Sequence, residues 1–206
     1  MRDNGRAGQT GPFFIRNPPL LDRLHIEVTN ICNFKCDFCP DAVMERQRGH
    51  MDFALLERLL GEVAGASLAR VTAFHLMGEP LLYPRIFDAI ALAVRLGIKL
   101  HLTTNGSTFA LKPDHVSRLV ASGVTKVTIS VQTPDPGTYA IRKAPARLTS
   151  DAYFAGILAF VRAYLNHPGS PTRVHLKFLD TTPHPFLVPQ KRLRVLDGRQ
   201  QLHETL

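Results

Sequence analysis

Four segments of the chain alternate apolar and polar residues with a period of two, the pattern of a β-strand with one buried face. In residues 98–104, for example, Ile98, Leu100 and Leu102 alternate with polar side chains. A fifth, mostly apolar run is also short enough for a strand. The sequence therefore predicts strands over 24–29, 71–76, 98–104, 125–131 and 172–179.

Helical periodicity lies between these segments. Apolar residues at helical spacing fill 53–63, and Asp52 is placed to cap that helix. Pro84 and Gly97 suit the first turn and the end of a second helix over 84–96, and Pro113 and Gly123 bracket a third in the same way. Thr149 or Ser150 is expected to cap a long helix to about residue 165. Strand and helix thus alternate, which is typical of a parallel α/β protein.

The alternation narrows the architecture further. Strands covered by helices on both faces usually form continuous apolar runs, whereas here the helices can cover only the apolar face. The other face is then either solvated or lines a polar interior, and regular helical crossovers favour the interior. We expect an open, partial (β/α) TIM-like barrel of about five to six parallel strands with outer helices and functional loops at the carboxyl ends of the strands.

Length and composition fit one globular domain. The chain has 206 residues, of which 45% are hydrophobic. We expect an N-terminal arm over 1–20, a core over 21–180 and a short, truncated C-terminal tail over 181–206. The tail is rich in proline and leaves room for one last strand around 192–196.

The formal net charge is +8, but the positive residues are scattered. We interpret the charge first as a solubility feature and second as a hint of an acidic substrate. No run is long enough to span a bilayer, and no basic stripe with interleaved aromatics suggests binding to single strands. We therefore expect neither a membrane nor a nucleic-acid partner. We expect the protein to be cytoplasmic.

The three cysteines are the most informative residues for the function of the chain. Cys32, Cys36 and Cys39 are the only cysteines, and they follow the first predicted strand with the spacing CxxxCxxC. They form at most one disulfide and leave one thiol, so a metal site is the better interpretation. Zinc would need a fourth ligand, which His25 or His50 could supply, and a redox thiol pair is a further alternative. An iron–sulfur cube on three thiolates would leave one iron open to a small molecule.

This motif resembles that of the radical S-adenosylmethionine (SAM) superfamily, in which an aromatic residue, here Phe38, precedes the last cysteine. The resemblance covers residues 24 to about 180. It is closest to the SPASM-type maturases, although the chain lacks their cysteine-rich C-terminal domain. It implies a 4Fe–4S cluster on Cys32, Cys36 and Cys39, with SAM on the open iron. An electron from the cluster would cleave SAM to methionine and a 5′-deoxyadenosyl radical.

The same resemblance implies several SAM contacts. Phe38 would hold the adenine. Gly78 and Glu79 resemble the end of the family's Gly-Gly-Glu-Pro segment, which contacts the SAM amino group, although Met77 replaces the first glycine. On sequence alone, an ordinary turn is the alternative for this segment, and core packing is the alternative for Phe38.

Three later residues complete the implied SAM site. Asn105 stands in a Thr-Asn-Gly turn of the kind that the family carries after the third strand. Ser130 points into the expected interior and would bond the SAM ribose or carboxylate. Arg142 ends the run Tyr139-Ala140-Ile141-Arg142, which resembles the family's Tyr-x-x-Ile-Arg element, in which the arginine can hold the SAM carboxylate. A solvated surface arginine is the alternative for Arg142.

We therefore expect a radical SAM enzyme whose radical abstracts hydrogen from a peptide or a cofactor precursor, with an electron donor such as flavodoxin or ferredoxin. No residue is assigned as a catalytic acid or base, because in this chemistry the protein mainly positions and shields the reactants. The alternative is a degenerate or truncated iron–sulfur or zinc-binding protein without catalysis. An RNA-modifying enzyme is a third hypothesis and rests on the charge alone.

Overall fold

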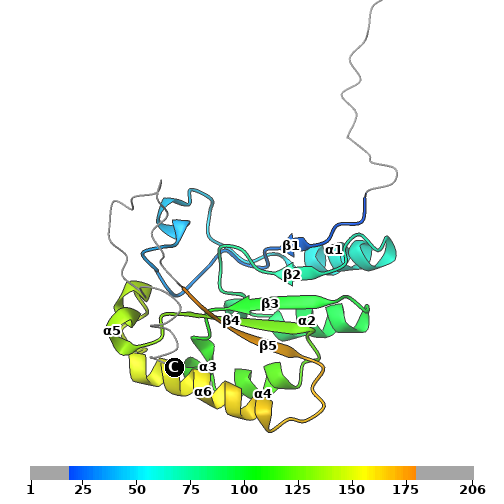
Figure 1. Cartoon of the computed structure of the whole chain (residues 1–206). Coiled ribbons are helices and arrows are strands. Elements are labelled where there is room, and N and C mark those ends of the chain that lie inside the picture. The colour runs from blue at the N-terminus through cyan, green and yellow to red at the C-terminus, as the bar shows by residue number, and fades with distance from the viewer. Residues whose placement is uncertain (1–18, 180–206) are drawn as a thin grey trace, which may run out of the picture.

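A computed structural model describes residues 19–179. Its five strands are all parallel and pair in chain order, so the sheet is open, with the first and last strands at its two edges (Figure 1). This confirms the predicted α/β class and the partial, open barrel. The strands are β1 Leu24–Ile26, β2 Thr72–Phe74, β3 Leu100–Thr104, β4 Lys126–Gln132 and β5 Arg173–Phe178.

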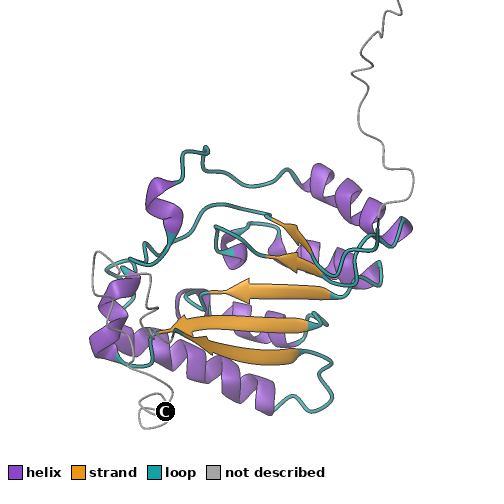
Figure 2. Ribbon diagram, turned by 45° about the horizontal axis from the view of Figure 1, so that its top comes forward, coloured by secondary structure: helices purple, strands orange, loops and turns teal. Residues whose placement is uncertain are grey.

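The longer helices lie on one side of this sheet (Figure 2). Three short 3-10 helices and two single-turn helices follow the carboxyl ends of strands. The α-helices are α1 Phe53–Gly65, α2 Ile86–Arg95, α3 Thr108–Leu111, α4 Asp114–Val120, α5 Pro136–Tyr139 and α6 Ser150–Leu165, and the 3-10 helices are η1 Pro40–Val43, η2 Pro80–Leu82 and η3 Ala140–Arg142.

Local sequence explains where the helices begin and end. Asp52 accepts a hydrogen bond from the Leu55 amide and Thr149 accepts one from the Ala152 amide, so both act as the predicted N-caps. Gly97 follows α2 with φ +70°, and its amide and that of Ile98 bond back to the carbonyls of Val94 and Ala93. This is a Schellman ending, which favours glycine.

One helix prediction needs correction, and one short helix was not predicted. The second helix begins at Ile86, with Arg85 as its N-cap, so Pro84 lies just before the helix and not in its first turn. The third predicted helix, between Pro113 and Gly123, is α4, with Pro113 as its N-cap. The single-turn helix α3 before it was not predicted and ends at Leu111. Proline at position 113 lacks the amide that would extend α3 further.

The prediction of one covered face is confirmed by the burial of the central strands. Along β3 and β4, buried and half-buried residues alternate strictly. The buried row Ile26, Phe74, Leu102 and Val127 runs across four strands in register and packs in the helix-side core. On the opposite face, the polar residues of β3 and β4 are half-buried, Ala73 of β2 is buried, and β5 is more exposed than its neighbours.

The arm, the tail and the strand expected at 192–196 fall at or beyond the ends of the described part, so the domain bounds stay predictions. Within residues 19–179, no helix has both the length and the apolar character needed to cross a membrane.

Candidate iron–sulfur centre

The three cysteines lie on the loop that connects β1 to η1, beyond the carboxyl ends of the strands (Figure 1). The Cys39 amide donates to the Cys36 carbonyl at 3.0 Å, which turns the chain tightly between them. The loop is also fixed from outside, because the Asp37 amide donates to the Ile141 carbonyl at 2.9 Å. The cysteine loop and η3 are therefore held together although they are about a hundred residues apart.

All three thiols are free and half-buried. Burial raises the pKa of Cys32 to about 11, and burial also raises the pKa of Cys36. Thiols with raised pKa values stay protonated at neutral pH unless a metal compensates the thiolate charge. The three half-buried thiols therefore suit a metal centre better than an exposed redox pair.

Two of the sulfurs receive hydrogen bonds from the protein. Arg142 Nε donates to Cys36 Sγ at 3.3 Å, and Asn105 Nδ2 donates to Cys32 Sγ at 3.7 Å. Donors directed at cysteine sulfurs are the means by which proteins tune iron–sulfur clusters. A thiolate-only donor set on one loop, with donors behind its sulfurs, fits a 4Fe–4S cluster.

A zinc site needs four ligands around a single point. Among residues 19–179, no three Cys, His, Asp or Glu side chains gather tightly enough to hold one ion. A cube places each thiolate on a different iron and does not require such convergence. The lack of such a group among residues 19–179 therefore favours the cluster over zinc.

Gly78 lies against the start of the cysteine loop. A Cβ atom at this position would stand 2.1 Å from the Thr29 carbonyl oxygen and 2.9 Å from the Asn30 Cα, so only glycine fits. The next amide, that of Glu79, donates to the Ile31 carbonyl at 2.9 Å. The segment 78–80 thus supports the loop and is more than an ordinary turn.

The Glu79 carboxylate is 2% exposed and accepts three hydrogen bonds from the protein. Oε1 accepts from the Leu81 amide and the Thr104 hydroxyl, and Oε2 accepts from the Asn105 amide at 2.5 Å. Burial raises the pKa of Glu79, although these donors oppose the shift. With three of its acceptor positions occupied, the carboxylate joins the loop after β2 to the end of β3.

Asn105 extends this network to the cysteines. Besides its contact with Cys32, its side chain donates to Asn33 Oδ1 at 3.0 Å and accepts from the Ser107 amide at 2.8 Å. Gly106 completes the turn with φ +76°. The predicted Thr-Asn-Gly turn therefore contacts the cysteine loop directly.

Arg142 is the largest fully buried side chain of the described chain, at 2% exposure. This contradicts the alternative of a solvated surface arginine. Its guanidinium lies 4.8 Å from the centre of the Phe34 ring, donates to the Val131 carbonyl and forms no ion pair within residues 19–179. A buried cation beside a cysteine sulfur is suited to the negative charge that a thiolate-bound cluster carries.

The other two predicted SAM contacts lie at the margins of this arrangement. Ser130 is half-buried on the polar face of β4, just before an irregularity of the strand at Gln132. Phe38 is half-buried on the loop, whereas Phe34 is buried against the rings of Tyr139 and Tyr153. All six SAM contacts stay predictions.

Sequence reasoning missed Asn33, Phe34 and Tyr153, which connect the loop to its surroundings. Tyr153 donates from its hydroxyl to the Asn105 carbonyl at 2.8 Å. Asn33 and Phe34 lie inside the cysteine motif, and that position was the only feature of the sequence that could have marked them as part of the site. Tyr153 occupies an ordinary helix position and carried no signal.

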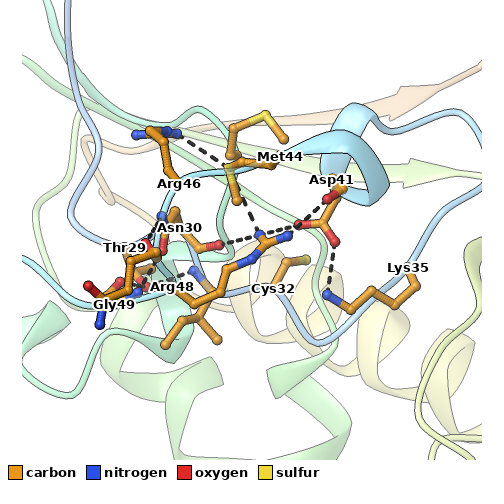
Figure 3. A network of polar contacts seen from close by, with 12 residues as sticks. Thr29, Asn30, Cys32, Lys35, Asp41, Met44, Arg46, Arg48 and Gly49 are labelled. Carbon is orange, nitrogen blue, oxygen red and sulfur yellow. Dashed lines mark hydrogen bonds and ion pairs between the residues drawn. The ribbon is translucent and has the colours of Figure 1, made fainter.

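A polar network closes the outer part of the loop (Figure 3). Asp41 is buried and pairs with Lys35 at 2.8 Å and with Arg48. Arg48 also donates to the carbonyls of Asn30 and Asp41, at 3.0 and 2.9 Å. The segment that leads from η1 to α1 is thereby fastened to the end of the first strand.

Comparisons with known proteins agree with this geometry. A family model described as "Radical SAM superfamily" matches residues 26–174. A GTP 3′,8-cyclase of Rhodopirellula baltica is 32% identical over 150 residues, which are 69% of this chain and 39% of the relative. A tungsten-containing aldehyde ferredoxin oxidoreductase cofactor-modifying protein of Pyrococcus furiosus is 29% identical over 108 residues, 52% of this chain and 30% of the relative.

Among solved structures, SuiB of Streptococcus suis bound to its precursor peptide SuiA superposes with a TM-score of 0.57 at 23% identity, over 75% of this chain and 32% of SuiB. That likeness concerns the fold alone. The chain spans 30 to 39% of the length of the two curated relatives described above. Because the family model covers most of the chain, including all three cysteines, the protein belongs to the radical SAM superfamily, whose members use a 4Fe–4S cluster and SAM.

Proposed function

We infer that this chain cleaves SAM reductively and directs the resulting radical to a hydrogen of its substrate. The observation that carries this inference is the set of three free thiols at the carboxyl edge of the sheet, with Arg142 and Asn105 donating to two of the sulfurs. When bound, the cluster supplies one electron to the sulfonium of SAM, whose carbon–sulfur bond breaks to give methionine and a 5′-deoxyadenosyl radical.

The residues of the chain have distinct parts in this proposal. Cys32, Cys36 and Cys39 bind the cluster. Asn105 and Arg142 stabilise thiolate charge, because their N–H groups point at sulfur. Since Arg142 is already bonded to Cys36 and Val131, a direct contact with the SAM carboxylate would use the donors of its guanidinium that these two partners leave over.

The remaining SAM contacts follow the family motif. Gly78 and Glu79 receive the amino group, and one free acceptor position on Glu79 is enough for one ammonium N–H. Ser130 bonds the ribose or carboxylate, and Phe38 packs against adenine. Each assignment rests on the motif and on a position at the carboxyl edge of the sheet.

For the substrate we propose a peptide or a cofactor precursor. Two observations on relatives support the second: one is named for GTP as a substrate and one for modifying a cofactor. An electron donor such as flavodoxin or ferredoxin would reduce the cluster. Three free thiols in one motif fit a reducing compartment, which supports the cytoplasm.

Anaerobic reconstitution of the full chain with iron and sulfide tests the function. We expect a broad brown absorbance, and release of 5′-deoxyadenosine when SAM and dithionite are added. Cys36→Ala should lose both signals, whereas Ser117→Ala, an exposed change on α4, should keep them. A complete cluster that releases no 5′-deoxyadenosine would support the non-catalytic alternative.

A further inference from the structure

The polar face of the sheet carries a row of basic side chains. His101 on β3, Lys126 on β4 and Arg173 on β5 are direct neighbours in the strand register. Adjacent parallel strands lie about 4.8 Å apart, and side chains in register on one face point the same way. Three basic residues therefore stand next to one another on the face opposite the helices.

More positive charge lies on the same face. Lys177 on β5 lies beside Ser130 of β4 in the strand register. It is two residues after His175 and therefore nearer the carboxyl edge of the sheet. Arg23 also stands near, because its charge helps to lower the pKa of both His75 and His101, after burial as the main cause. Burial, followed by the charges of Arg23, Lys126 and Arg173 among others, brings the pKa of His101 to about 4, so His101 is neutral at pH 7 and can donate a hydrogen bond.

This charge is not balanced within the sheet. The five strands contain no acidic residue. Glu27, just after β1, is already paired with Arg46 at 2.8 Å and accepts from the Met77 amide. Within the described chain, Lys126, Arg173 and Lys177 form no salt bridge, and the Nδ1 atom of His101 is buried without a hydrogen-bond partner.

Such an arrangement costs stability, since like charges directly opposite in a sheet repel each other. Local conflicts of this kind mark places where function, not folding, selects the residues. An anion that binds the face would remove the conflict. Lysine and arginine together are the side chains that recognise phosphate groups.

We propose that the polar face binds the phosphate groups of a small-molecule substrate that carries at least two phosphates. This proposal rests on the proposed function, because it names the substrate class of the same site. Of the two proposed substrate classes, it favours the cofactor precursor over the peptide.

The position of the charge sets the length of that substrate. Lys126 lies four residues before Ser130 along β4. At about 3.3 Å per residue, the two side chains are about 13 Å apart along the sheet. The reacting end of the substrate would lie near the cysteine loop and its phosphates at the far end of the strands, which is the span of a nucleotide-sized molecule.

Binding of inorganic tripolyphosphate tests the proposal, measured by isothermal titration calorimetry on the reconstituted full chain at about 0.15 M salt. The test variant is the double substitution Lys126→Gln and Arg173→Gln. Its matched control, Arg58→Gln with Arg95→Gln, removes the same number of charges from exposed positions on α1 and α2. We expect the wild type to bind, the test variant to bind at least tenfold more weakly, and the control to stay within twofold.

Equal weakening in both variants, or no binding by the wild type, would overturn the proposal, provided that circular dichroism shows both variants folded. A single-stranded RNA oligonucleotide and an acidic peptide are titrated in parallel. If either needs Lys126 and Arg173 while tripolyphosphate does not bind, the proposal is wrong and the occupant is that macromolecule.

Release of 5′-deoxyadenosine in the same samples, without added anion, distinguishes failure of the proposed SAM cleavage from failure of the proposed phosphate binding. A wild type that releases 5′-deoxyadenosine but does not bind tripolyphosphate contradicts only the substrate class. A wild type that binds the anion without SAM cleavage contradicts the proposed function and leaves an anion site that needs Lys126 and Arg173.

Discussion

Arg142 Nε donates to Cys36 Sγ at 3.3 Å across 106 residues of sequence. Its second anchor is the Val131 carbonyl at the irregular end of β4, and the guanidinium is shielded from water beneath the cysteine loop. The contact joins the loop of three thiols to η3, which follows β4 and α5. A charged donor in this position acts on the electronic state of whatever metal the sulfur binds.

The first prediction concerns the potential of the cluster. Replacing Arg142 by Gln removes a positive charge and the N–H donor at Cys36, and both normally favour the reduced, more negative cluster. A loss on the order of 1 kcal/mol corresponds to about 40 mV for one electron. We expect a more negative midpoint potential in a redox titration followed by electron paramagnetic resonance.

Two further variants make this result specific. Arg147→Gln removes an exposed charge from the following loop and should leave the potential within about 10 mV, because exposed charges are screened. Arg142→Lys keeps the charge and should recover part of the shift. A potential that is unchanged in Arg142→Gln, with the cluster fully assembled, would mean that the hydrogen bond does not act on it.

The second prediction concerns the close approach at Gly78. Gly78→Ala places a methyl group against the backbone at Thr29, which cannot move as a side chain can. Overpacking of this kind costs about 1 to 3 kcal/mol of the free energy of unfolding. Thermal unfolding followed by circular dichroism should show a lower midpoint and reduced cluster content.

Gly61→Ala is the matched control. Gly61 lies inside α1, and a Cβ there meets nothing within 4 Å. Alanine in a helix interior stabilises by about 0.5 to 1 kcal/mol relative to glycine. The two substitutions should therefore shift the unfolding midpoint in opposite directions, and equal shifts would contradict the role given to Gly78.

Much of this fold was predictable because its signals are local. The period of two in β3 and β4 fixed which face is buried, and Asp52 and Thr149 mark helix starts through their own side-chain bonds. The cysteine spacing placed the metal loop after the first strand. Each of these features depends on only a few consecutive residues.

The network around the cysteines was not predictable in the same way. Nothing in the sequence indicated that Arg142 packs on Phe34 and bonds Cys36. Nor did the sequence indicate that the Glu79 carboxylate accepts hydrogen bonds from Thr104, Asn105 and Leu81. These contacts join residues far apart in sequence, so no periodicity records them.

The third prediction concerns the pH dependence of stability through Glu79. Burial raises its pKa, so the folded chain binds this proton more tightly than the unfolded chain. The free energy of unfolding should therefore fall as pH rises from the ordinary value for glutamate, about 4.3, through the raised pKa. Glu79→Gln does not titrate and should lack this part of the slope.

Urea unfolding of the reconstituted chain between about pH 5 and 8 measures this slope, with cluster absorbance checked at each pH. Glu57→Gln, at an exposed position of α1, is the control and should keep the wild-type slope. Wild type and Glu79→Gln with parallel pH profiles would show that Glu79 is not the titrating group.

The fourth prediction concerns the segment that leads from η1 to α1. Arg48 joins the carbonyls of Asn30 and Asp41 and pairs with the Asp41 carboxylate, while the Gly49 amide donates to Asn30 Oδ1 at 2.7 Å. Arg48→Ala removes the bonds of Arg48 to the Asn30 carbonyl and to Asp41, although Asp41 keeps its pair with Lys35. Because Arg48 is partly exposed, we expect a cost of only about 1 kcal/mol for local opening, which is roughly a fivefold faster amide hydrogen exchange at Gly49.

Arg46→Ala provides the comparison within the same segment. Arg46 is 58% exposed, pairs with Glu27 at 2.8 Å and donates to Met44 Sδ at 3.5 Å, and exposed ion pairs contribute little to stability. Its removal should change exchange at Gly49 by less than about twofold. If both substitutions accelerate exchange equally, the segment is held by its overall charge; if only Arg48→Ala does, it is held by the directed bonds to Asn30 and Asp41. The second outcome would tie the outer segment of the cysteine loop to the carboxyl end of β1, where the thiols begin.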